Sequence, residues 1–174
     1  MLAEGILLSI QVETGKVKVS EEENDIKEVI NNLLQIIEET IKEKKLVVNI
    51  NVDINAARFK FDKKILSVVL FAIFENAALY NKDCGKIDIR TEKLKDRPFM
   101  QITISDTGYG IPKAEQEKIF GRYWRGEKAK EIKPQGFGLG TYLSKKLIEL
   151  LGGSIRFISN TNEGTTIFVE LPIK

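Results

Sequence analysis

An aspartate followed by two closely spaced glycines, in the segment DTGYGIP at residues 106–112, is a pattern that could bind a ligand. The residues before it alternate as in a strand, so a turn toward the core would carry the Asp106 carboxylate inward. A buried carboxylate requires hydrogen-bond donors, and the exocyclic amine of adenine is such a donor, whereas guanine presents an acceptor there. Gly108 and Gly110 would leave room for a purine ring, or they would simply permit a turn at the strand end.

A second glycine-rich segment, GFGLG at residues 136–140, comes immediately before a helical pattern. Glycines at a helix N-terminus let backbone N–H groups approach a phosphate, whose charge the helix dipole favours. The segment could also be a flexible connection into the helix. Its GxGxG spacing, without a preceding strand, distinguishes it from the dinucleotide-binding fingerprint.

Two adjacent polar residues, Glu75 and Asn76, interrupt the otherwise apolar helical segment ILSVVLFAIFENAALY. Such a helix is expected to be buried, so both side chains need partners. Ala72, Asn76 and Tyr80 share one face because they are four residues apart. Asn76 could bond neighbouring backbone, or its oxygen could be a ligand for Mg²⁺, which prefers hard oxygen donors. Tyr80 could close over a phosphate or a ribose.

Residues 113–135, between the two glycine segments, contain seven basic and four acidic side chains, a net charge of +3. A loop of this length is usually either functional or disordered, and its lysines fit a solvated surface. Within it, IFGRYWR supplies the aromatic residues Phe120, Tyr123 and Trp124 as an apolar anchor. The neighbouring Arg122 and Arg125 could then move onto a triphosphate.

These segments need helices and strands to position them, and the hydrophobic periodicity predicts where those lie. Residues 1–19 predict a short helix end and an extended linker. An amphipathic helix follows, capped either by Ser20 with Glu23 or by Asp25 with Glu28, and Asp62 is the expected N-cap of a second helix. The predicted helices are 26–41, 63–80 and 139–151, and the predicted strands are 46–54, 58–61, 86–92, 99–105, 154–159 and 165–171.

This order of elements predicts an α+β fold. Because hairpins dominate, we expect a two-layer sandwich in which three helices cover one face of a mixed, mostly antiparallel sheet. A long polar segment occupies about 111–137.

The composition is that of one globular domain, with 174 residues, 43% hydrophobic and 30% charged. The net charge of +2 is too small to indicate nucleic-acid binding, and no apolar run approaches the roughly 18 residues that span a bilayer. We find neither a signal peptide nor a lipidation motif. The single cysteine, Cys84, excludes an internal disulfide and favours the cytoplasm. The chain has no histidine, so any histidine in its chemistry belongs to another segment or molecule.

Taken together and in this order, the segments resemble the ATP-binding catalytic domain of sensor histidine kinases. That superfamily also contains gyrase-type ATPases, heat-shock chaperones and mismatch-repair ATPases. FENAALYN is similar to its N box, DTGYGIP to its first glycine box, IFGRYWRG to its F box, and GFGLGTYLSKKLIELLGGSI to its second glycine box. GTTIFVELP resembles the closing strand. The resemblance implies that residues 1–19 are the end of a dimerisation helix and a linker, and that residues 20–174 are the catalytic domain with an ATP lid at about 111–137.

The resemblance also implies roles for individual residues. Asp106 would bind the adenine amine, with Thr165 nearby through water, and Asn76 would ligate Mg²⁺. Arg125 would be the lid residue that reaches the γ-phosphate, so Asn76 and Arg125 are the implied catalytic residues. The other implied nucleotide-binding positions are Tyr80, Gly108, Gly110, Ile111, Phe120, Arg122, Tyr123, Gly136, Gly138, Leu139 and Gly140.

The implied activity is transfer of the γ-phosphoryl group of ATP, with Mg²⁺, to a histidine on a separate dimerisation and phosphoacceptor domain. The implied partners are that domain and a downstream response regulator, without nucleic acid. We expect the full-length protein to be a homodimer located in the cytoplasm or forming the cytoplasmic part of a membrane-bound sensor. We expect this chain to be a monomer that binds ATP without phosphorylating a histidine of its own.

Two positions depart from the family pattern. Ala72 stands where the N box usually has a polar residue, and Leu79 stands where a lysine is common, although Lys82 could substitute for it. These departures leave open the alternative of a catalytically weak nucleotide-sensing module. A second alternative is a stand-alone serine kinase or ATPase of the anti-sigma-factor type, against which the linker-like residues 6–19 argue. The absence of a carboxylate at position 72 argues against a dedicated ATP hydrolase.

Overall fold

A five-stranded sheet forms one layer of the computed structural model, which describes residues 2–53 and 57–173. The strands lie in the order β2-β4-β5-β7-β6, and only the β2–β4 pair is parallel among the pairs of this sheet. The predicted mixed, mostly antiparallel sheet is thus confirmed. Its strands are β2 (Val47–Val52), β4 (Lys86–Lys93), β5 (Phe99–Asp106), β6 (Ser154–Asn160) and β7 (Gly164–Pro172).

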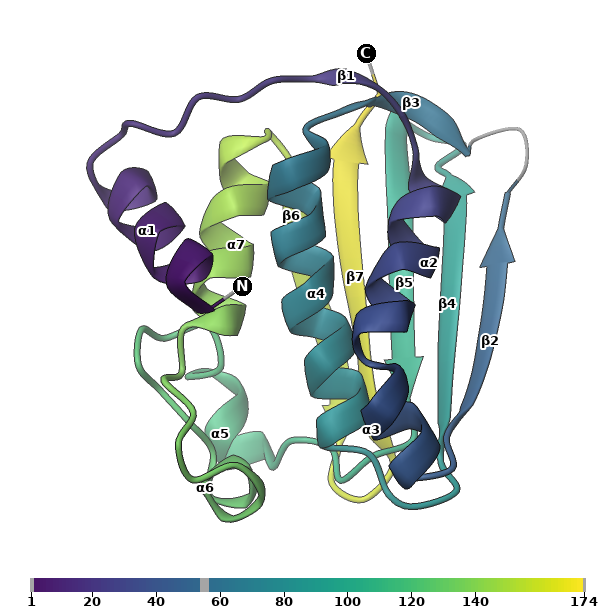
Figure 1. Ribbon diagram of the computed structural model, residues 1–174, viewed down its shortest axis with the longest axis vertical. Helices are drawn as coiled ribbons and strands as arrows, with labels where there is room; N and C mark the ends of the chain where they lie inside the picture. Colours follow the sequence, from purple (N-terminus) through teal and green to yellow (C-terminus); the bar gives the residue numbers. More distant parts are fainter. Residues whose placement is uncertain (1, 54–56, 174) are drawn as a thin grey trace.

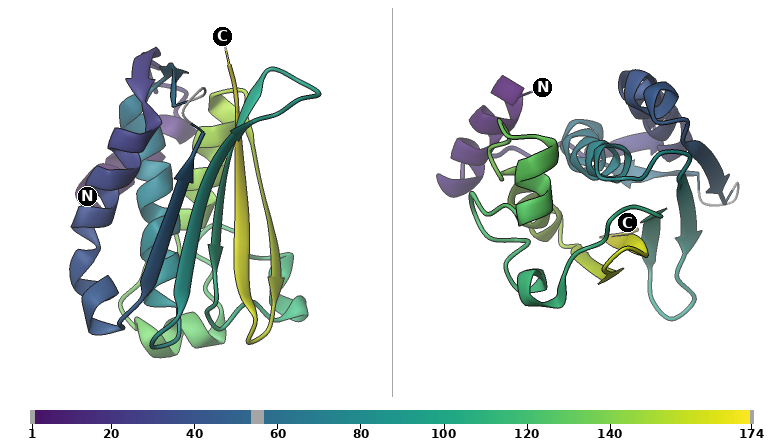
Figure 2. Two further views of the ribbon diagram at one scale, coloured as in Figure 1. Left: turned by 90° about the vertical axis from the view of Figure 1, so that its right-hand side faces the viewer. Right: turned by 90° about the horizontal axis from the view of Figure 1, so that it is seen from below.

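Helices α2 (Ile26–Ile36), α4 (Lys63–Leu79) and α7 (Gly140–Leu150) form the second layer. They lie side by side on one face of the sheet, as Figure 1 and the left view of Figure 2 show. The central helix α4 buries eight side chains, including Leu66, Leu70 and Phe74, against sheet residues such as Ile89 and Ile102. The two-layer sandwich predicted from the sequence is therefore the observed architecture.

The N-caps of α2 and α4 are residues that the sequence predicted, and the structure decides between the two candidates for α2. Asp25 is the N-cap of α2 and accepts a hydrogen bond from the Lys27 N–H, whereas the Ser20 N–H donates to Asp62 at 2.8 Å. Asp62 also caps α4 by accepting from the Ile65 N–H. It thus joins the start of the central helix to the segment that leads into the domain.

Two features of the N-terminal third differ from the predicted elements. The first long helix ends at Ile36, and a separate helix, α3 (Glu38–Glu43), follows. No glycine or proline marks this break, so periodicity alone could not locate it. Strand β1 (Glu22–Asp25) pairs with β3 (Arg58–Phe61) in a small second sheet, outside the main layer. The predicted end of the preceding strand at Ile54 lies outside the described residues.

Helix α1 (Leu2–Glu13) packs beside α7, and its Leu8 is buried in the same core. The extended segment that follows crosses the top of the molecule in Figure 1 to reach β1. None of the described helices is long and apolar enough to cross a membrane.

The lid segment, residues 111–137, contains two short helices, α5 (Lys113–Gln116) and α6 (Glu127–Ile132). It connects the end of β5 to the start of α7 and lies at the lower left of Figure 1, below α7. The first glycine segment lies at its beginning and the second at its end. Both segments contact α4, the first at Tyr80 and the second at Ala72.

Candidate functional site

The carboxylate of Asp106 lies at the end of β5, next to the start of β7. One oxygen, Oδ1, accepts hydrogen bonds from the Gly108 N–H at 2.8 Å and the Thr165 N–H at 3.2 Å. Among the described residues, the other oxygen, Oδ2, has no recorded hydrogen bond. Burial raises the pKa of Asp106 to about 6, although the two backbone N–H groups act to lower it. The predicted inward turn of this carboxylate is thus observed, with one oxygen held in place and one available.

The two glycines of the first segment are required by the packing of the turn itself. A Cβ atom on Gly108 would collide with the Tyr80 carbonyl oxygen at the end of α4. Gly110 has φ +63°, and a Cβ atom there would collide with the Asn160 carbonyl of the β6–β7 turn. The Tyr109 N–H donates to the Tyr80 carbonyl at 3.1 Å. Close backbone contact therefore fixes the turn between α4 and the β6–β7 hairpin.

The face of α4 that carries Asn76 is directed toward the beginning of α7. A Cβ atom on Gly140 would lie 3.4 Å from the Cβ of Ala72, one turn before Asn76. The Asn76 side chain is half-buried, and the described residues provide it with no hydrogen-bond partner. Tyr80, one turn further, is also half-buried. An unpaired amide oxygen at this position fits a hard cation such as Mg²⁺.

The N-terminus of α7 is not capped by a side chain, because Leu139 occupies its N-cap position. Gly138 has φ +65° and packs against the Trp124 carbonyl, while a Cβ atom on Gly136 would lie 2.9 Å from the Arg125 guanidinium carbon. The second glycine segment thus packs against the F-box residues Trp124 and Arg125. The first N–H groups of α7 point toward the lid end, which is suitable for an anion.

The two lid arginines bind other parts of the protein in this structure. The Arg125 guanidinium donates to the carbonyls of Ala129, Lys133 and Pro134, within the lid itself. The Arg122 guanidinium forms an ion pair with Glu13 of α1 at 2.9 Å and stacks over the Tyr123 ring. Neither arginine is directed to the α4 face, so the phosphate contacts expected of them stay predictions.

The aromatic residues of the F box divide into two groups. Phe120 packs against Phe157 of β6 with 5.8 Å between ring centroids. The Thr141 hydroxyl of α7 also donates to the Ile119 carbonyl at 2.7 Å, so this part of the lid is anchored. Tyr123 was expected to belong to the anchor, but that expectation is wrong because its side chain is 59% exposed.

A comparison with known protein families identifies the domain. Residues 61–174 match the model of the family described as "Histidine kinase-, DNA gyrase B-, and HSP90-like ATPase". The chain belongs to this ATPase family. The matched range begins at the last residue of β3 and contains α4, both glycine segments and the lid.

Individual relatives of this ATPase domain are sensor kinases. The sensor histidine kinase WalK of Bacillus subtilis is 34% identical over 115 residues, which are 66% of this chain and 19% of WalK. The circadian input-output histidine kinase CikA of Synechococcus elongatus is 29% identical over 173 residues, or 98% of this chain and 23% of CikA. The chain thus spans about a fifth to a quarter of the length of these relatives, and its predicted kinship with histidine kinases is confirmed.

Solved structures agree with the fold. The catalytic domain of histidine kinase ThkA superposes with a TM-score of 0.75 at 24% identity, covering 88% of this chain and 98% of that one. A structure of ThkA in complex with the response regulator protein TrrA gives a TM-score of 0.74 at 22% identity, covering 99% of this chain and 48% of that one. The α+β sandwich of this ATPase domain is therefore the fold of histidine kinase catalytic domains.

Sequence reasoning missed two residues that hold this candidate site together. Asn81 is fully buried, and its amide bonds the Lys86 carbonyl, the Lys82 N–H and the Thr107 hydroxyl, so it connects the end of α4 to the first glycine segment. Ser159 accepts from the Ile111 N–H at 2.8 Å and bonds the Thr165 hydroxyl, also at 2.8 Å. In sequence, an asparagine after a helix and a serine near a hairpin turn indicate only turn formation.

That Lys82 substitutes for the missing N-box lysine stays a prediction. The Lys82 ammonium donates to the Asn162 carbonyl in the β6–β7 turn, at the Asp106 end of the site. A different lysine, Lys133 of the lid, reaches α4 and forms an ion pair with Glu75 at 3.0 Å. The sequence contained no periodic signal for this contact, because the two residues are far apart in the chain and one lies in an irregular segment.

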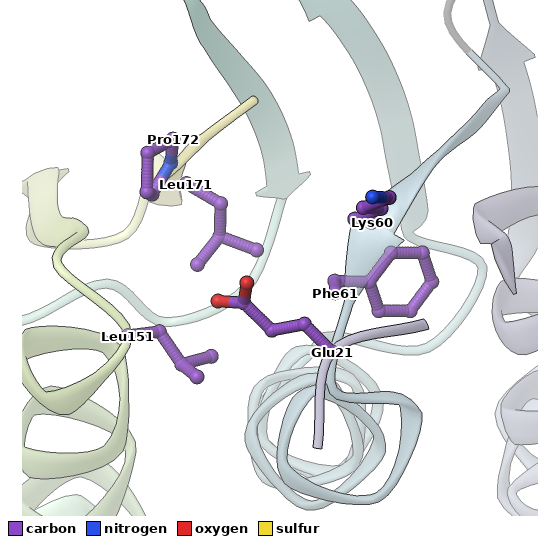
Figure 3. Close-up of a pocket in the computed structure, with 6 residues that line it drawn as sticks. All are labelled: Glu21, Lys60, Phe61, Leu151, Leu171 and Pro172. Carbon is purple, nitrogen blue, oxygen red and sulfur yellow. The ribbon is translucent and has the colours of Figure 1, made fainter. Parts of the chain in front are cut away.

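Two cavities elsewhere in the molecule are separate from this site. Figure 3 shows a small cavity of about 10 Å³, which could hold about one water molecule. It lies at the opposite end of the sheet from Asp106, and its lining residues are Glu21, Lys60, Phe61, Leu151, Leu171 and Pro172. A wider groove of about 430 Å³ lies between α2, α3 and β2. Neither is lined by a predicted site residue.

Proposed function

We propose that this chain binds ATP together with Mg²⁺ and donates the γ-phosphoryl group to a histidine on a separate helical phosphoacceptor domain. The observation that carries the proposal is the half-bonded carboxylate of Asp106, fixed between the first glycine segment and β7. Its Oδ2 is suited to accept from the amine of adenine. The family match, to an ATPase domain, supports ATP as the nucleotide.

The proposed arrangement extends from Asp106 along α4. Asn76 would hold Mg²⁺, whose charge would offset that of the phosphates, and the uncapped start of α7 would face the phosphate groups. Arg125 would reach the γ-phosphate once it gives up its carbonyl partners in the lid. The remaining glycine, lid and β7 positions implied by the family resemblance would border the nucleotide.

The nucleophile in this proposal comes from outside the chain, which has no histidine. An imidazole nitrogen would attack the γ-phosphorus, the bond to the β–γ bridging oxygen would break, and ADP would leave with that electron pair. Ala72 packs against the start of α7 and provides no carboxylate to activate water, so transfer is favoured over hydrolysis. A response regulator would be the next acceptor, a proposal supported by the structure of ThkA in complex with the response regulator protein TrrA. We place the domain in the cytoplasm, where ATP is supplied.

A mixing experiment tests the proposal. The chain is incubated with γ-labelled ATP, Mg²⁺ and the histidine-bearing helical hairpin of a related sensor kinase. We expect phosphate on the hairpin that is labile in acid and stable in alkali, and none on this chain. Acid-stable phosphate on a partner would instead identify a serine kinase. ATP binding without any transfer to several such hairpins would support the nucleotide-sensing alternative.

A further inference from the structure

We propose that Lys133 binds the phosphates of the nucleotide and that Glu75 competes with those phosphates for it. This inference rests on the proposed function, because it assigns a further phosphate ligand to the same site. It starts from the ion pair between the Lys133 ammonium and the Glu75 carboxylate, at 3.0 Å. The pair connects the lid directly to the helix that carries Asn76.

The position of Glu75 makes this pair relevant to the phosphates. Ala72, Glu75, Asn76 and Leu79 form one stripe of α4, since they follow the three- and four-residue spacing of a helix face. The start of α7 packs against this stripe at Ala72. The stripe has no positive charge of its own, although a polyphosphate beside Asn76 and the α7 N-terminus requires cations. Among the described residues, Lys133 is the cation whose side chain pairs with a side chain of this stripe.

The lid backbone holds Lys133 in this position. Lys133 follows the last turn of α6 as its C-cap, and its carbonyl accepts from Arg125, which also binds the carbonyls of Ala129 and Pro134. Three residues further along the chain, the second glycine segment begins. Arg125 therefore acts in this structure as a positioning residue that fixes the end of α6 and directs Lys133 toward α4.

The ion pair is weak enough to exchange. The side chain of Lys133 is 43% exposed and that of Glu75 is 39% exposed, and such pairs contribute little to stability. A lysine has a flexible four-carbon stem, so its ammonium can leave one carboxylate for a nearby anion. A triphosphate carries more negative charge than one carboxylate and would win this competition. Because the ion pair with Glu75 must break before Lys133 binds a phosphate, Glu75 would lower the affinity for ATP.

Competition predicts opposite effects for the two partners of one ion pair. Lys133→Gln removes a phosphate ligand, and we expect ATP affinity to fall roughly 5- to 30-fold, as for loss of one charge-assisted hydrogen bond. Glu75→Gln releases the lysine, and we expect ATP affinity to rise about 2- to 5-fold, as for loss of an exposed pair. If the pair only anchored the lid, both substitutions would change affinity in the same direction.

The experiment is a calorimetric titration of each variant with ATP and Mg²⁺, and with adenosine, which has no phosphates. Adenosine affinity should be the same in wild type, Lys133→Gln and Glu75→Gln. Lys130→Gln is the matched control, because Lys130 is a lid lysine whose partner, Glu127, lies within α6. Lys133→Arg should retain most of the ATP affinity. Circular dichroism checks that each variant is folded.

The inference would be overturned if Lys133→Gln bound ATP with wild-type affinity, or if Glu75→Gln bound ATP more weakly than wild type. It would also be overturned if Lys133→Gln lost affinity for ATP and for adenosine by the same factor. Asp106→Asn, measured in parallel, separates this failure from that of the proposed function. If Asp106→Asn loses affinity for ATP while Lys133→Gln retains it, only the role of Lys133 is wrong. If Asp106→Asn also keeps full affinity, the proposed nucleotide site itself is wrong.

Discussion

Replacing Asp106 by asparagine should weaken ATP binding and, at the same time, stabilise the folded domain. The two side chains have nearly the same shape, and an asparagine Oδ1 can still accept from the Gly108 and Thr165 N–H groups. The change removes the negative charge and replaces the available oxygen by an NH₂ donor. The adenine amine would then face a donor instead of an acceptor.

The expected gain in stability follows from the pKa of Asp106. Burial raises it from the usual 3.8 to about 6, and each pKa unit corresponds to about 1.4 kcal/mol. Between these two pH values the folded state binds more protons than the unfolded state, so the free energy of unfolding falls as pH rises through that window. At pH 7 the full cost of the buried charge is present. We therefore expect Asp106→Asn to raise the free energy of unfolding by about 1–3 kcal/mol.

The expected loss of binding comes from one charge-assisted hydrogen bond, about 1.5–3 kcal/mol or roughly 10- to 150-fold in affinity. Calorimetry at pH 7.5 measures the affinity, and thermal unfolding without nucleotide should show a midpoint several degrees higher than wild type. Asp96→Asn is the control, because Asp96 is exposed in the β4–β5 hairpin at the other end of the sheet. A lower unfolding midpoint together with unchanged ATP affinity in Asp106→Asn would refute the reasoning.

Two further predictions concern the same end of the site. ATP affinity of the wild type should fall as pH decreases through about 6, because a protonated Asp106 has lost its charge. Titrations from pH 5 to 8 should show no such decrease in Asp106→Asn. The same pH dependence of ATP affinity in both proteins would contradict this. Asn81→Ala should lower the free energy of unfolding by about 1–3 kcal/mol, since the Thr107 hydroxyl loses the acceptor to which it donates and the Lys86 carbonyl loses its amide donor. Urea denaturation measures this loss, and a change below about 0.5 kcal/mol would show that Asn81 is not holding the turn.

Most of the fold was predictable from the sequence because its signals are local. The alternation in KIDIRTE and FMQITIS and the apolar stripe of α4 each identify an element by its own period. Asp62 marked the start of α4 correctly, since capping depends on residues within one turn. The break at Ile37 and the small β1–β3 sheet were not predictable, because they depend on packing between distant segments.

The candidate site was predictable in its fixed part and not in its lid. Asp106 and the two glycine segments are identified by residue types at close spacing, and the structure brings them to one end of the domain. The lid contacts join residues far apart in sequence, such as Arg122 with Glu13 and Lys133 with Glu75. No spacing rule relates these pairs, so sequence patterns could not distinguish a lysine on a solvated loop from one that reaches α4.

This division reflects different physical demands at the two ends of the site. Selecting a base requires a rigid acceptor, and two backbone N–H groups hold Asp106. Its carboxylate is half-buried, so its charge has an energetic cost that the rest of the fold must offset. Holding and releasing a phosphate tail requires contacts that exchange, and the lid uses ion pairs that are partly exposed to water. Burying Lys133 and Glu75 more deeply would strengthen their pair and make the lysine unavailable to a phosphate. The low stability of the lid contacts is therefore a condition for the function proposed here.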